Sequence, residues 1–347
     1  MFWTSYFDWK DYKFGIGQEP FVRAGCRITN CITTYDRSLV NESDALIFHP
    51  INYFEKDLPV YRMPHQRYVF FFHEAQTSFR EYPIFHHPPK WFFNWTMTYR
   101  RDSDVYSPDA YGILRRKNKS QITDTFPVEL APGTKPPDPA MLLQMARAEN
   151  RSLQPDILNK TKKIAWFVSN CDTESKREVF FSKLFQYFQE IDVYGECGIL
   201  KCVPWNTPEC DKVLYKYKFY ISAENTICAD YVTEKFYRAL DVGVVPIVYG
   251  GADYASYAPT HSFIHVDDFH SPKALADYLY LLDQNPSLYL KYFEWKKDWD
   301  VIRNPSNGWC DLCAKLNEPN QPTKKYEDIG KWMYEEIPCF PGSKIKK

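Results

Sequence analysis

The segment 220–250, which reads YISAENTICADYVTEKFYRALDVGVVPIVYG, holds the densest group of polar residues that could bind a ligand. The candidates lie between the end of an apolar run and the start of a helical stretch: Glu224, Asn225, Tyr231, Glu234 and Lys235. Free backbone N–H groups and the helix dipole favour an anion at such a position. Lys235 adds a positive charge, and Glu234 could accept a hydrogen bond from a ribose or sugar hydroxyl. The simpler alternative, a solvated Glu–Lys pair on a helix, is open at this point.

A second polar group follows an earlier apolar run at 164–168. Ser169 and Asn170 come directly after that run, and Arg177 lies at the start of the next helical stretch. If both runs are parallel strands, Arg177 and Lys235 lie over the same edge of one sheet. An Arg fork and a Lys together suit a nucleotide diphosphate whose charge the protein itself neutralises. The alternative is that the arginine pairs with a neighbouring glutamate on a solvated helix face.

Asp102 and Asp104 form an Asp-x-Asp triplet with Ser103 between them. Many glycosyltransferases use such a pair to hold a divalent metal ion that acts as a Lewis acid on a sugar diphosphate. Here Arg100 and Arg101 precede the triplet and could neutralise it in a structural salt-bridge cluster. The triplet also lies far in sequence from Lys235. We therefore favour the structural interpretation and predict no bound metal.

The second half of the chain alternates between strand-like runs and helical stretches. In order, we expect a strand at 164–168, a helix at 174–191, a strand end at 193–195, a strand at 219–222, a helix at 233–242 and a strand at 244–249. Gly243 is placed to end the helix at 233–242, and Pro246 costs the last strand one ladder hydrogen bond. This alternation is typical of a parallel, doubly wound α/β sheet.

The first half is less regular, with its clearest strands at 45–48 and 68–72. A proline-rich stretch at 128–139 and a helix at 140–149 separate the two halves. We interpret the first half as a second α/β domain that faces the other. Two such domains leave a cleft at the carboxyl ends of both sheets, where ligands bind in this architecture.

Composition narrows the class of protein. The chain has 347 residues, enough for two domains, and its 44% hydrophobic and 25% charged residues indicate a packed globular protein. A formal net charge of −1 argues against nucleic-acid binding, which requires a basic face. The aromatic share of 18% fits a large aromatic core, and also a cleft in which rings stack on sugars.

The 10 cysteines indicate an oxidising compartment. Their short spacings predict local disulfides, Cys26 with Cys31 and Cys310 with Cys313, and leave open whether others are free. A zinc site or a redox Cys-x-x-Cys is the alternative at the second pair, but neither a nearby His pair nor a helix start is expected there. Sequons for N-glycosylation also favour the secretory pathway and occur at Asn41, Asn94, Asn118, Asn150 and Asn159.

No run of 18 apolar residues is present, and the aromatic but charged start at 1–13 is not a signal peptide. We expect a lumenal portion that lacks an N-terminal anchor.

Three stretches together resemble the α1,3-fucosyltransferase family. The stretch 217–251 is similar to the donor-binding motif of that family, 93–104 (FNWTMTYRRDSD) to its second block and 31–49 (CITTYDRSLVNESDALIFH) to its first. A closing Cys-x-x-Cys is also typical, and the similarity runs from about residue 20 to residue 340. The resemblance implies an α/β protein of two facing Rossmann-like domains with a central cleft, the GT-B type. It also implies inverting transfer of L-fucose from GDP-fucose to O3 of GlcNAc, with no metal required.

The resemblance also implies roles for individual residues. Glu74, directly after a strand, is the general base that takes the proton of the attacking sugar hydroxyl. The residues implied to bind GDP-fucose are Tyr111, Ser169, Asn170, Arg177, Tyr220, Asn225, Tyr231, Glu234 and Lys235. The domains are expected at 1–150 for the acceptor, 151–325 for the donor and 326–347 as a C-terminal segment.

The family also implies the Golgi lumen, a type II membrane anchor that is not present in this chain, and a glycan acceptor, either LacNAc or an N-glycan. The ending 308–319 resembles invertebrate members and favours the innermost GlcNAc of N-glycans. Two other classes stay open, a metal-dependent glycosyltransferase that uses Asp102 and Asp104, and a non-catalytic protein that binds nucleotide sugars or glycans.

Overall fold

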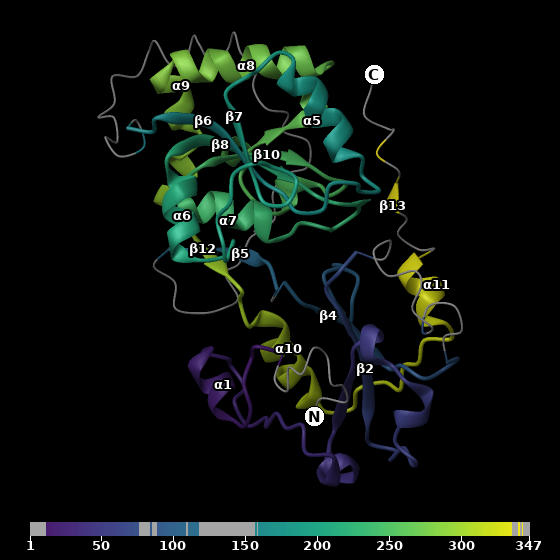
Figure 1. The fold of residues 1–347 in the computed structure, drawn as a ribbon. Helices are drawn as coiled ribbons and strands as arrows, with labels where there is room; N and C mark the ends of the chain where they lie inside the picture. Colours follow the sequence, from purple (N-terminus) through teal and green to yellow (C-terminus); the bar gives the residue numbers. More distant parts are fainter. Residues whose placement is uncertain are drawn as a thin grey trace.

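A computed structural model describes residues 12–75, 84, 89–108, 110–117, 157, 159–334, 339–340 and 342. The second half forms a five-stranded sheet in the order β11-β10-β8-β6-β7, and every pairing in it is parallel. Its strands are β6 (Lys162–Phe167), β7 (Ile191–Tyr194), β8 (Tyr217–Ala223), β10 (Val245–Tyr249) and β11 (Ile264–His265). The predicted parallel, doubly wound sheet is confirmed (Figure 1).

Helices cover both faces of this sheet because its strands are apolar on both sides. On one face, Phe181, Leu184 and Leu279 belong to the same buried cluster as Ile221. On the other, Leu214 and Ala239 belong to a second cluster with residues of the strands. The helices are α5 (Arg177–Phe185), α6 (Pro208–Tyr215), α7 (Glu234–Val242), α8 (Pro272–Gln284) and α9 (Pro286–Lys291).

Local sequence signals set several of these helix ends. Ser271 caps α8 through its hydroxyl, followed by a proline in the first turn. Gly243, with a φ of 80° in the left-handed region, ends α7 at the residue where the helix was predicted to end. The helix expected at 174–191 is shorter, because Lys176 adopts a left-handed backbone before α5 and the helix ends at Phe185.

The first half contains a four-stranded parallel sheet in the order β1-β2-β3-β4. Its strands are β1 (Ala45–Phe48), β2 (Arg67–Phe72), β3 (Trp95–Thr98) and β4 (Val105–Tyr106), with α1 (Glu19–Arg23) before them. The two strands expected in this half are therefore present. The helix expected at 140–149 lies outside the described residues.

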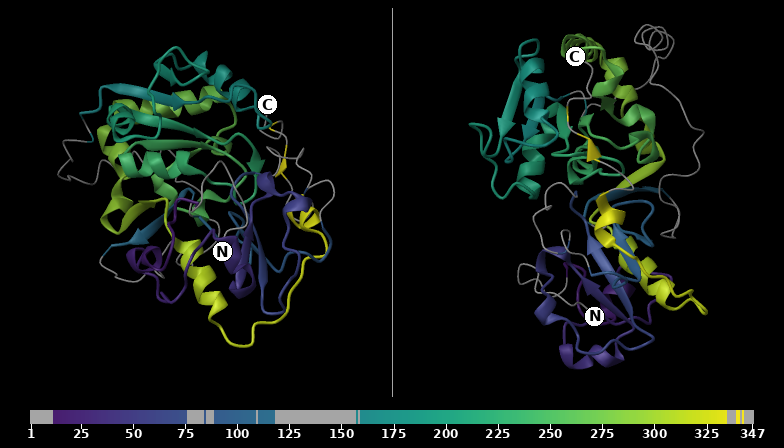
Figure 2. Two further views of the ribbon diagram at one scale, coloured as in Figure 1. Left: turned by 60° about the horizontal axis from the view of Figure 1, so that its bottom comes forward. Right: turned by 90° about the vertical axis from the view of Figure 1, so that its right-hand side faces the viewer.

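The last part of the chain returns from the second half to the first. β12 (Trp299–Arg303) pairs antiparallel with β5 (Gly112–Arg116), and β13 (Cys339–Phe340) pairs with β9 (Ile227–Cys228). Between them, α10 (Asn307–Leu316) packs on the core of the first sheet, and α11 (Ile329–Tyr334) also lies beside the first half. Figure 2 shows this return path in yellow along the first sheet.

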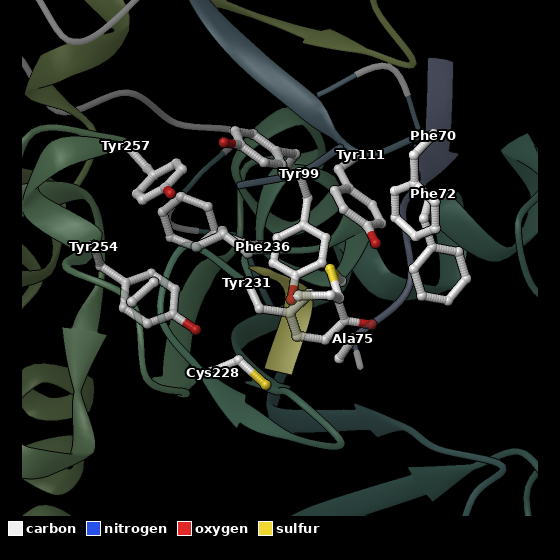
Figure 3. Close-up of a cluster of buried hydrophobic side chains, with 14 of the residues drawn as sticks. Phe70, Phe72, Ala75, Tyr99, Tyr111, Cys228, Tyr231, Phe236, Tyr254 and Tyr257 are labelled. Atoms are coloured by element: carbon white, nitrogen blue, oxygen red, sulfur yellow. The ribbon is translucent and has the colours of Figure 1, made fainter. Parts of the chain in front are cut away.

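The two halves share one hydrophobic core. Phe70, Phe72 and Tyr99 from the first half belong to the same buried cluster as Tyr231 and Phe236 from the second (Figure 3). The two sheets therefore cannot separate without exposing apolar side chains to water. The residue bounds assigned above to the two domains and to the C-terminal segment stay a prediction.

The predicted local disulfides are wrong. Cys26 is bonded to Cys310 and Cys31 to Cys313, across sequence separations of 284 and 282 residues. The helix α10, which was not expected, places its two cysteines side by side on one face, so that each can bond to a cysteine of the segment 26–31. The remaining cysteines form Cys171–Cys197, Cys202–Cys210 and Cys228–Cys339, so that no cysteine is free.

The sequons differ in exposure. Asn41 and Asn159 are exposed, whereas Asn94 is 2% exposed, its amide donating to the Lys324 carbonyl and accepting from the Tyr68 N–H. A glycan at Asn94 does not fit this fold. The other two sequons lie outside the described residues. Among the described residues, no helix has the length and apolar character to cross a bilayer.

Candidate functional site

A pocket of about 250 Å³ lies at the carboxyl ends of β6, β7 and β8. The strand order changes direction between β6 and β8, and ligands bind at this kind of switch point in doubly wound sheets. Among its lining residues are Phe167, Ser169, Asn170, Arg177, Tyr194, Cys202, Trp205, Tyr220, Asn225, Glu234 and Lys235. The structure thus brings Arg177 and Lys235 into one pocket, as the two motifs predicted.

Arg177 forms part of the wall of this pocket and is only 3% exposed. Its guanidinium donates to the Ala223 carbonyl at 2.5 Å and to the Asn170 carbonyl at 3.1 Å. Burial lowers the pKa of Arg177 from its ordinary high value. The alternative, a pairing of Arg177 with a glutamate on a solvated helix face, is not found in the described part of the chain, because the guanidinium donates to two backbone carbonyls.

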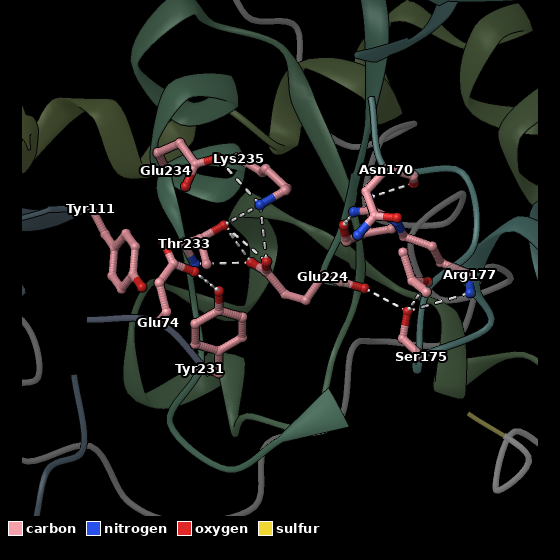
Figure 4. Close-up of polar contacts among 12 residues, drawn as sticks. Glu74, Tyr111, Asn170, Ser175, Arg177, Glu224, Tyr231, Thr233, Glu234 and Lys235 are labelled. Atoms are coloured by element: carbon pink, nitrogen blue, oxygen red, sulfur yellow. Dashed lines mark hydrogen bonds and ion pairs between the residues drawn. The ribbon is translucent and has the colours of Figure 1, made fainter. Parts of the chain in front are cut away.

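Lys235 lies in the first turn of α7, and its ammonium donates to Thr233 Oγ1 at 2.8 Å, Glu234 at 3.2 Å and Glu224 at 3.3 Å. Burial favours the neutral amine, but the two glutamates outweigh burial and raise the pKa of Lys235. Burial likewise works against the charged form of Glu234, but Lys235 outweighs it and lowers the pKa of that carboxyl. Lys235 is therefore held as a cation beside the pocket (Figure 4).

Two buried polar atoms around the pocket lack partners. Arg177 Nε and Asn225 Oδ1 have no hydrogen-bond partner among the described residues. Buried donors and acceptors are normally satisfied, because an unmet one costs roughly 1–3 kcal/mol. Both residues line the same pocket, so that a polar ligand bound there, with a small shift of these side chains, can supply the missing partners.

Glu74 follows β2 in the first half and meets the second half through Tyr231, whose hydroxyl donates to the carboxylate at 3.1 Å. Burial raises the pKa of Glu74, and the nearby Glu234 raises it further, while Lys235 and Tyr231 oppose the shift. Tyr111 packs edge-on against Tyr231 at 6.1 Å between ring centroids, and its hydroxyl donates to the His73 carbonyl. A carboxylate with a raised pKa beside the pocket is suited to accept a proton.

The predicted donor residues thus fall into two sets. All of them except Tyr111 and Tyr231 line the pocket, and these two tyrosines lie beside Glu74 instead. Sequence reasoning missed Tyr194 and Trp205, which line the aromatic end of the pocket. Tyr194 ends the second strand of the sheet, so its position at the strand's carboxyl end could have identified it. Trp205 lies in an irregular loop, and no sequence signal places it there.

The Asp-x-Asp triplet is occupied by contacts within the chain. Asp102 pairs with the Arg100 guanidinium at 2.5 Å, as the structural interpretation predicted, whereas Arg101 is directed elsewhere and bonds to the Ser256 carbonyl. Asp104 accepts hydrogen bonds from Thr96, Lys324 and Tyr326. In the described part of the chain, no group of three or more His, Cys, Asp or Glu residues is arranged to hold a metal ion.

Comparison with known proteins identifies the family. The model of the fucosyltransferase N-terminal region matches residues 1–112, and that of glycosyltransferase family 10 (fucosyltransferase), C-terminal, matches residues 157–332. The chain belongs to glycosyltransferase family 10, the fucosyltransferases. This fucosyltransferase is 38% identical to alpha-(1,3)-fucosyltransferase C of Drosophila melanogaster, with 100% of this chain and 79% of the relative covered.

Another relative is glycoprotein 3-alpha-L-fucosyltransferase A of Drosophila melanogaster, which is 34% identical over 91% of this chain and 57% of the relative. A crystal structure of an α1,3-fucosyltransferase with GDP-fucose has the same fold, with a TM-score of 0.50, 17% identity and coverage of 81% of this chain and 80% of that one. The GT-B type arrangement of two facing α/β domains is therefore confirmed. The protein is an enzyme, a glycosyltransferase of the α1,3-fucosyltransferase kind, as the three motifs predicted.

Proposed function

We propose that this enzyme transfers L-fucose from GDP-fucose to O3 of a GlcNAc residue in a glycan, with inversion at the anomeric carbon. The observation that carries the proposal is the pocket shared by Arg177 and Lys235 at the sheet's switch point. GDP leaves with two phosphate groups, and two protein cations in a partly buried pocket stabilise that developing charge.

Glu74 is the general base of the proposed reaction. Its carboxylate takes the proton from the acceptor O3 while that oxygen forms a bond to C1 of fucose. The bond between C1 and the β-phosphate oxygen breaks, and GDP departs with the electron pair. Tyr231 supports this role by donating to the carboxylate, which fixes the side chain at the junction of the two halves.

The acceptor and the compartment are also proposals. The first acceptor to test is the innermost GlcNAc of an N-glycan, with LacNAc as the second, because the relatives are named for both kinds: one as a glycoprotein 3-alpha-L-fucosyltransferase and another, from Mus musculus, as a 4-galactosyl-N-acetylglucosaminide 3-alpha-L-fucosyltransferase. We propose the Golgi lumen as the site of action. Ten cysteines that are all paired support an oxidising compartment.

The direct test offers GDP-fucose with a trimmed N-glycan and with a type 2 LacNAc, followed by mass spectrometry of the products. One added fucose, removed only by an α1,3-specific fucosidase, is the expected result. A protein that binds GDP but transfers to neither these nor a wide panel of acceptors would instead be a non-catalytic binding protein.

The role of Glu74 is tested with the Glu74→Gln variant, which keeps the size and removes the charge. We expect turnover to fall by about 10²–10⁴-fold, the usual contribution of a general base. The affinity for GDP is the matched control, because Glu74 does not line the pocket that holds the diphosphate. Normal turnover by a folded Glu74→Gln enzyme would rule out this base.

A further inference from the structure

Glu224 is a fully buried carboxylate at the end of β8 that does not line the donor pocket. One carboxylate oxygen accepts from the Thr233 backbone N–H at 2.9 Å, and the Thr233 hydroxyl also reaches the carboxylate at 2.9 Å. The other oxygen accepts from the Lys235 ammonium at 3.3 Å. The side chain thus holds the start of α7 and the cation of the first turn at the same time.

The backbone of the same strand end holds the second cation. The Ala223 carbonyl accepts from the Arg177 guanidinium, and the Glu224 carbonyl accepts from Ser175 Oγ at 2.8 Å, just before α5. The Glu224 N–H donates to the Tyr249 carbonyl of β10 at 2.8 Å. Figure 4 shows Glu224 between the Lys235 group and the Arg177 group. Two adjacent residues, Ala223 and Glu224, therefore hold the two cations and set the distance between them.

We propose that Glu224 is a positioning residue for the transfer: its carboxylate fixes the Lys235 ammonium where the diphosphate of the donor binds. The inference rests on the proposed function and deepens it. With 0% exposure, Glu224 cannot touch the donor, so that it acts only through Lys235 and Thr233. A long lysine side chain has many rotamers, and holding one of them before the donor arrives reduces the entropy that binding must remove.

The alternative role for a buried carboxylate near a diphosphate is the opposite one. Its negative charge opposes the phosphates, so that removing the charge would tighten the GDP complex. The two roles therefore predict opposite changes in GDP affinity. The positioning role predicts weaker binding without Glu224, and a role of charge alone predicts tighter binding.

A change in pH dependence gives a second readout. The titratable groups that face Lys235 are Tyr220 from β8, Glu224 directly after β8, Glu234 from α7, Arg177 from α5 and Glu74 from the first half. Burial lowers the pKa of Lys235, but Glu224 and Glu234 outweigh burial and raise it above its ordinary value. Removing the charge of Glu224 therefore lowers the pKa of Lys235. As the pH rises, Lys235 then loses its charge earlier, and GDP binding is lost at a lower pH than in the wild-type protein.

The experiment compares GDP binding by calorimetry in the wild-type protein, Glu224→Gln and Asp283→Asn across a range of pH. Asp283 is a matched control, because it is a largely buried carboxylate that holds Lys163 and Lys218 at the opposite, amino-terminal edge of the same sheet. For Glu224→Gln we expect the Kd for GDP to rise by about 10- to 100-fold, as for a lost hydrogen bond to a charged group. The alkaline limit of binding also moves to lower pH.

The KM for the glycan acceptor stays unchanged in Glu224→Gln, and Asp283→Asn shows neither the loss of GDP affinity nor the shift in pH. If Glu224→Gln does not fold, Thr233→Val replaces it, since this change removes only the hydroxyl shared by Glu224 and Lys235. The same direction of change is expected for it, with a smaller size.

An unchanged or tighter GDP complex in a folded Glu224→Gln or Thr233→Val protein would overturn the inference. If the wild-type protein itself neither binds GDP nor transfers fucose, the proposed function fails as well. If the wild-type protein does both and the variants match it, only the role of Glu224 fails.

Discussion

Charged residues gather at strand ends in two regions, around Lys235 in the second half and around Asp104 in the first. The two regions differ in whether the chain itself supplies the hydrogen-bond partners of their polar groups. Around Lys235, a pocket remains and polar atoms of Arg177 and Asn225 lack partners. Around Asp104, the carboxylate accepts from a strand N–H, a lysine and a tyrosine of the returning C-terminal segment. The first region is open to a ligand, and the second is closed by the chain itself.

This difference separates function from stability. A cluster that leaves buried hydrogen-bonding groups unmet around a cavity is arranged for a molecule that is not part of the fold. A cluster whose carboxylate oxygens already accept hydrogen bonds from the chain joins distant parts of the fold. Here it joins β3 to the segment that contains Lys324 and Tyr326. Residue types alone do not distinguish the two, because both regions combine acidic and basic side chains.

The largest effect is expected from Lys235→Gln, which removes the cation of the open region. We expect kcat to fall by about 10²–10³-fold, because the variant loses preorganised charge aimed at the leaving group. Thermal unfolding should show that the variant is folded, and turnover of the wild-type enzyme should persist in excess EDTA. A kcat equal to that of the wild type in the folded variant would mean that the region around Lys235 does not stabilise the leaving group.

The next effect concerns the disulfides that close the first half. Replacing both Cys31 and Cys313 by serine opens a loop of 282 residues, and we expect the free energy of unfolding to fall by about 2–4 kcal/mol. Denaturant unfolding measures this loss, and the Kd for GDP should not change.

The contrasting pair is Cys202–Cys210, which spans 8 residues and borders the donor pocket. Its removal should cost less stability but weaken GDP binding. If both double variants changed GDP binding equally, the disulfide beside the donor pocket would have no special role in binding the donor.

Asp104→Asn tests the closed region directly. Losing the charged acceptor of the hydrogen bonds from Thr96, Lys324 and Tyr326 should lower the free energy of unfolding by about 1.5–3 kcal/mol. The kcat of the folded variant should equal that of the wild type, since Asp104 holds the C-terminal segment and takes no part in transfer. A folded variant without activity would instead place this residue in the reaction, as expected for a metal-dependent enzyme.

The smallest effect is a shift in pH dependence. Glu74 acts as a base only when it is deprotonated, so activity falls as the pH drops through its pKa. Burial raises that pKa, so the acid limb of kcat/KM should lie above the ordinary value for glutamate of about 4.3. Tyr231→Phe removes a hydrogen bond to the carboxylate and should move the limb to still higher pH. A limb at lower pH in that variant would contradict the assignment.

The regular parts of the fold were predictable from sequence because they depend on local patterns. The apolar runs at 45–48 and 244–249 indicated buried strands, and their alternation with helical stretches in the second half predicted the parallel sheet. The shared pocket of Arg177 and Lys235 followed in turn, since parallel strands bring their carboxyl ends to one edge.

What the sequence did not reveal depends on contacts between residues far apart in the chain. The pairing of Cys26 with Cys310 depends on the return of α10 to the first half, which no local pattern reveals. The burial of Asn94 depends equally on the backbone near Lys324. Glu224 was visible in the motif, but its role depends on the full set of contacts at the strand end.

A structure of this enzyme with GDP tests the central claim most directly. The account predicts diphosphate oxygens within hydrogen-bond distance of the Lys235 ammonium and the Arg177 guanidinium, beside the end of β8. A diphosphate bound elsewhere, with neither cation in reach, would contradict it.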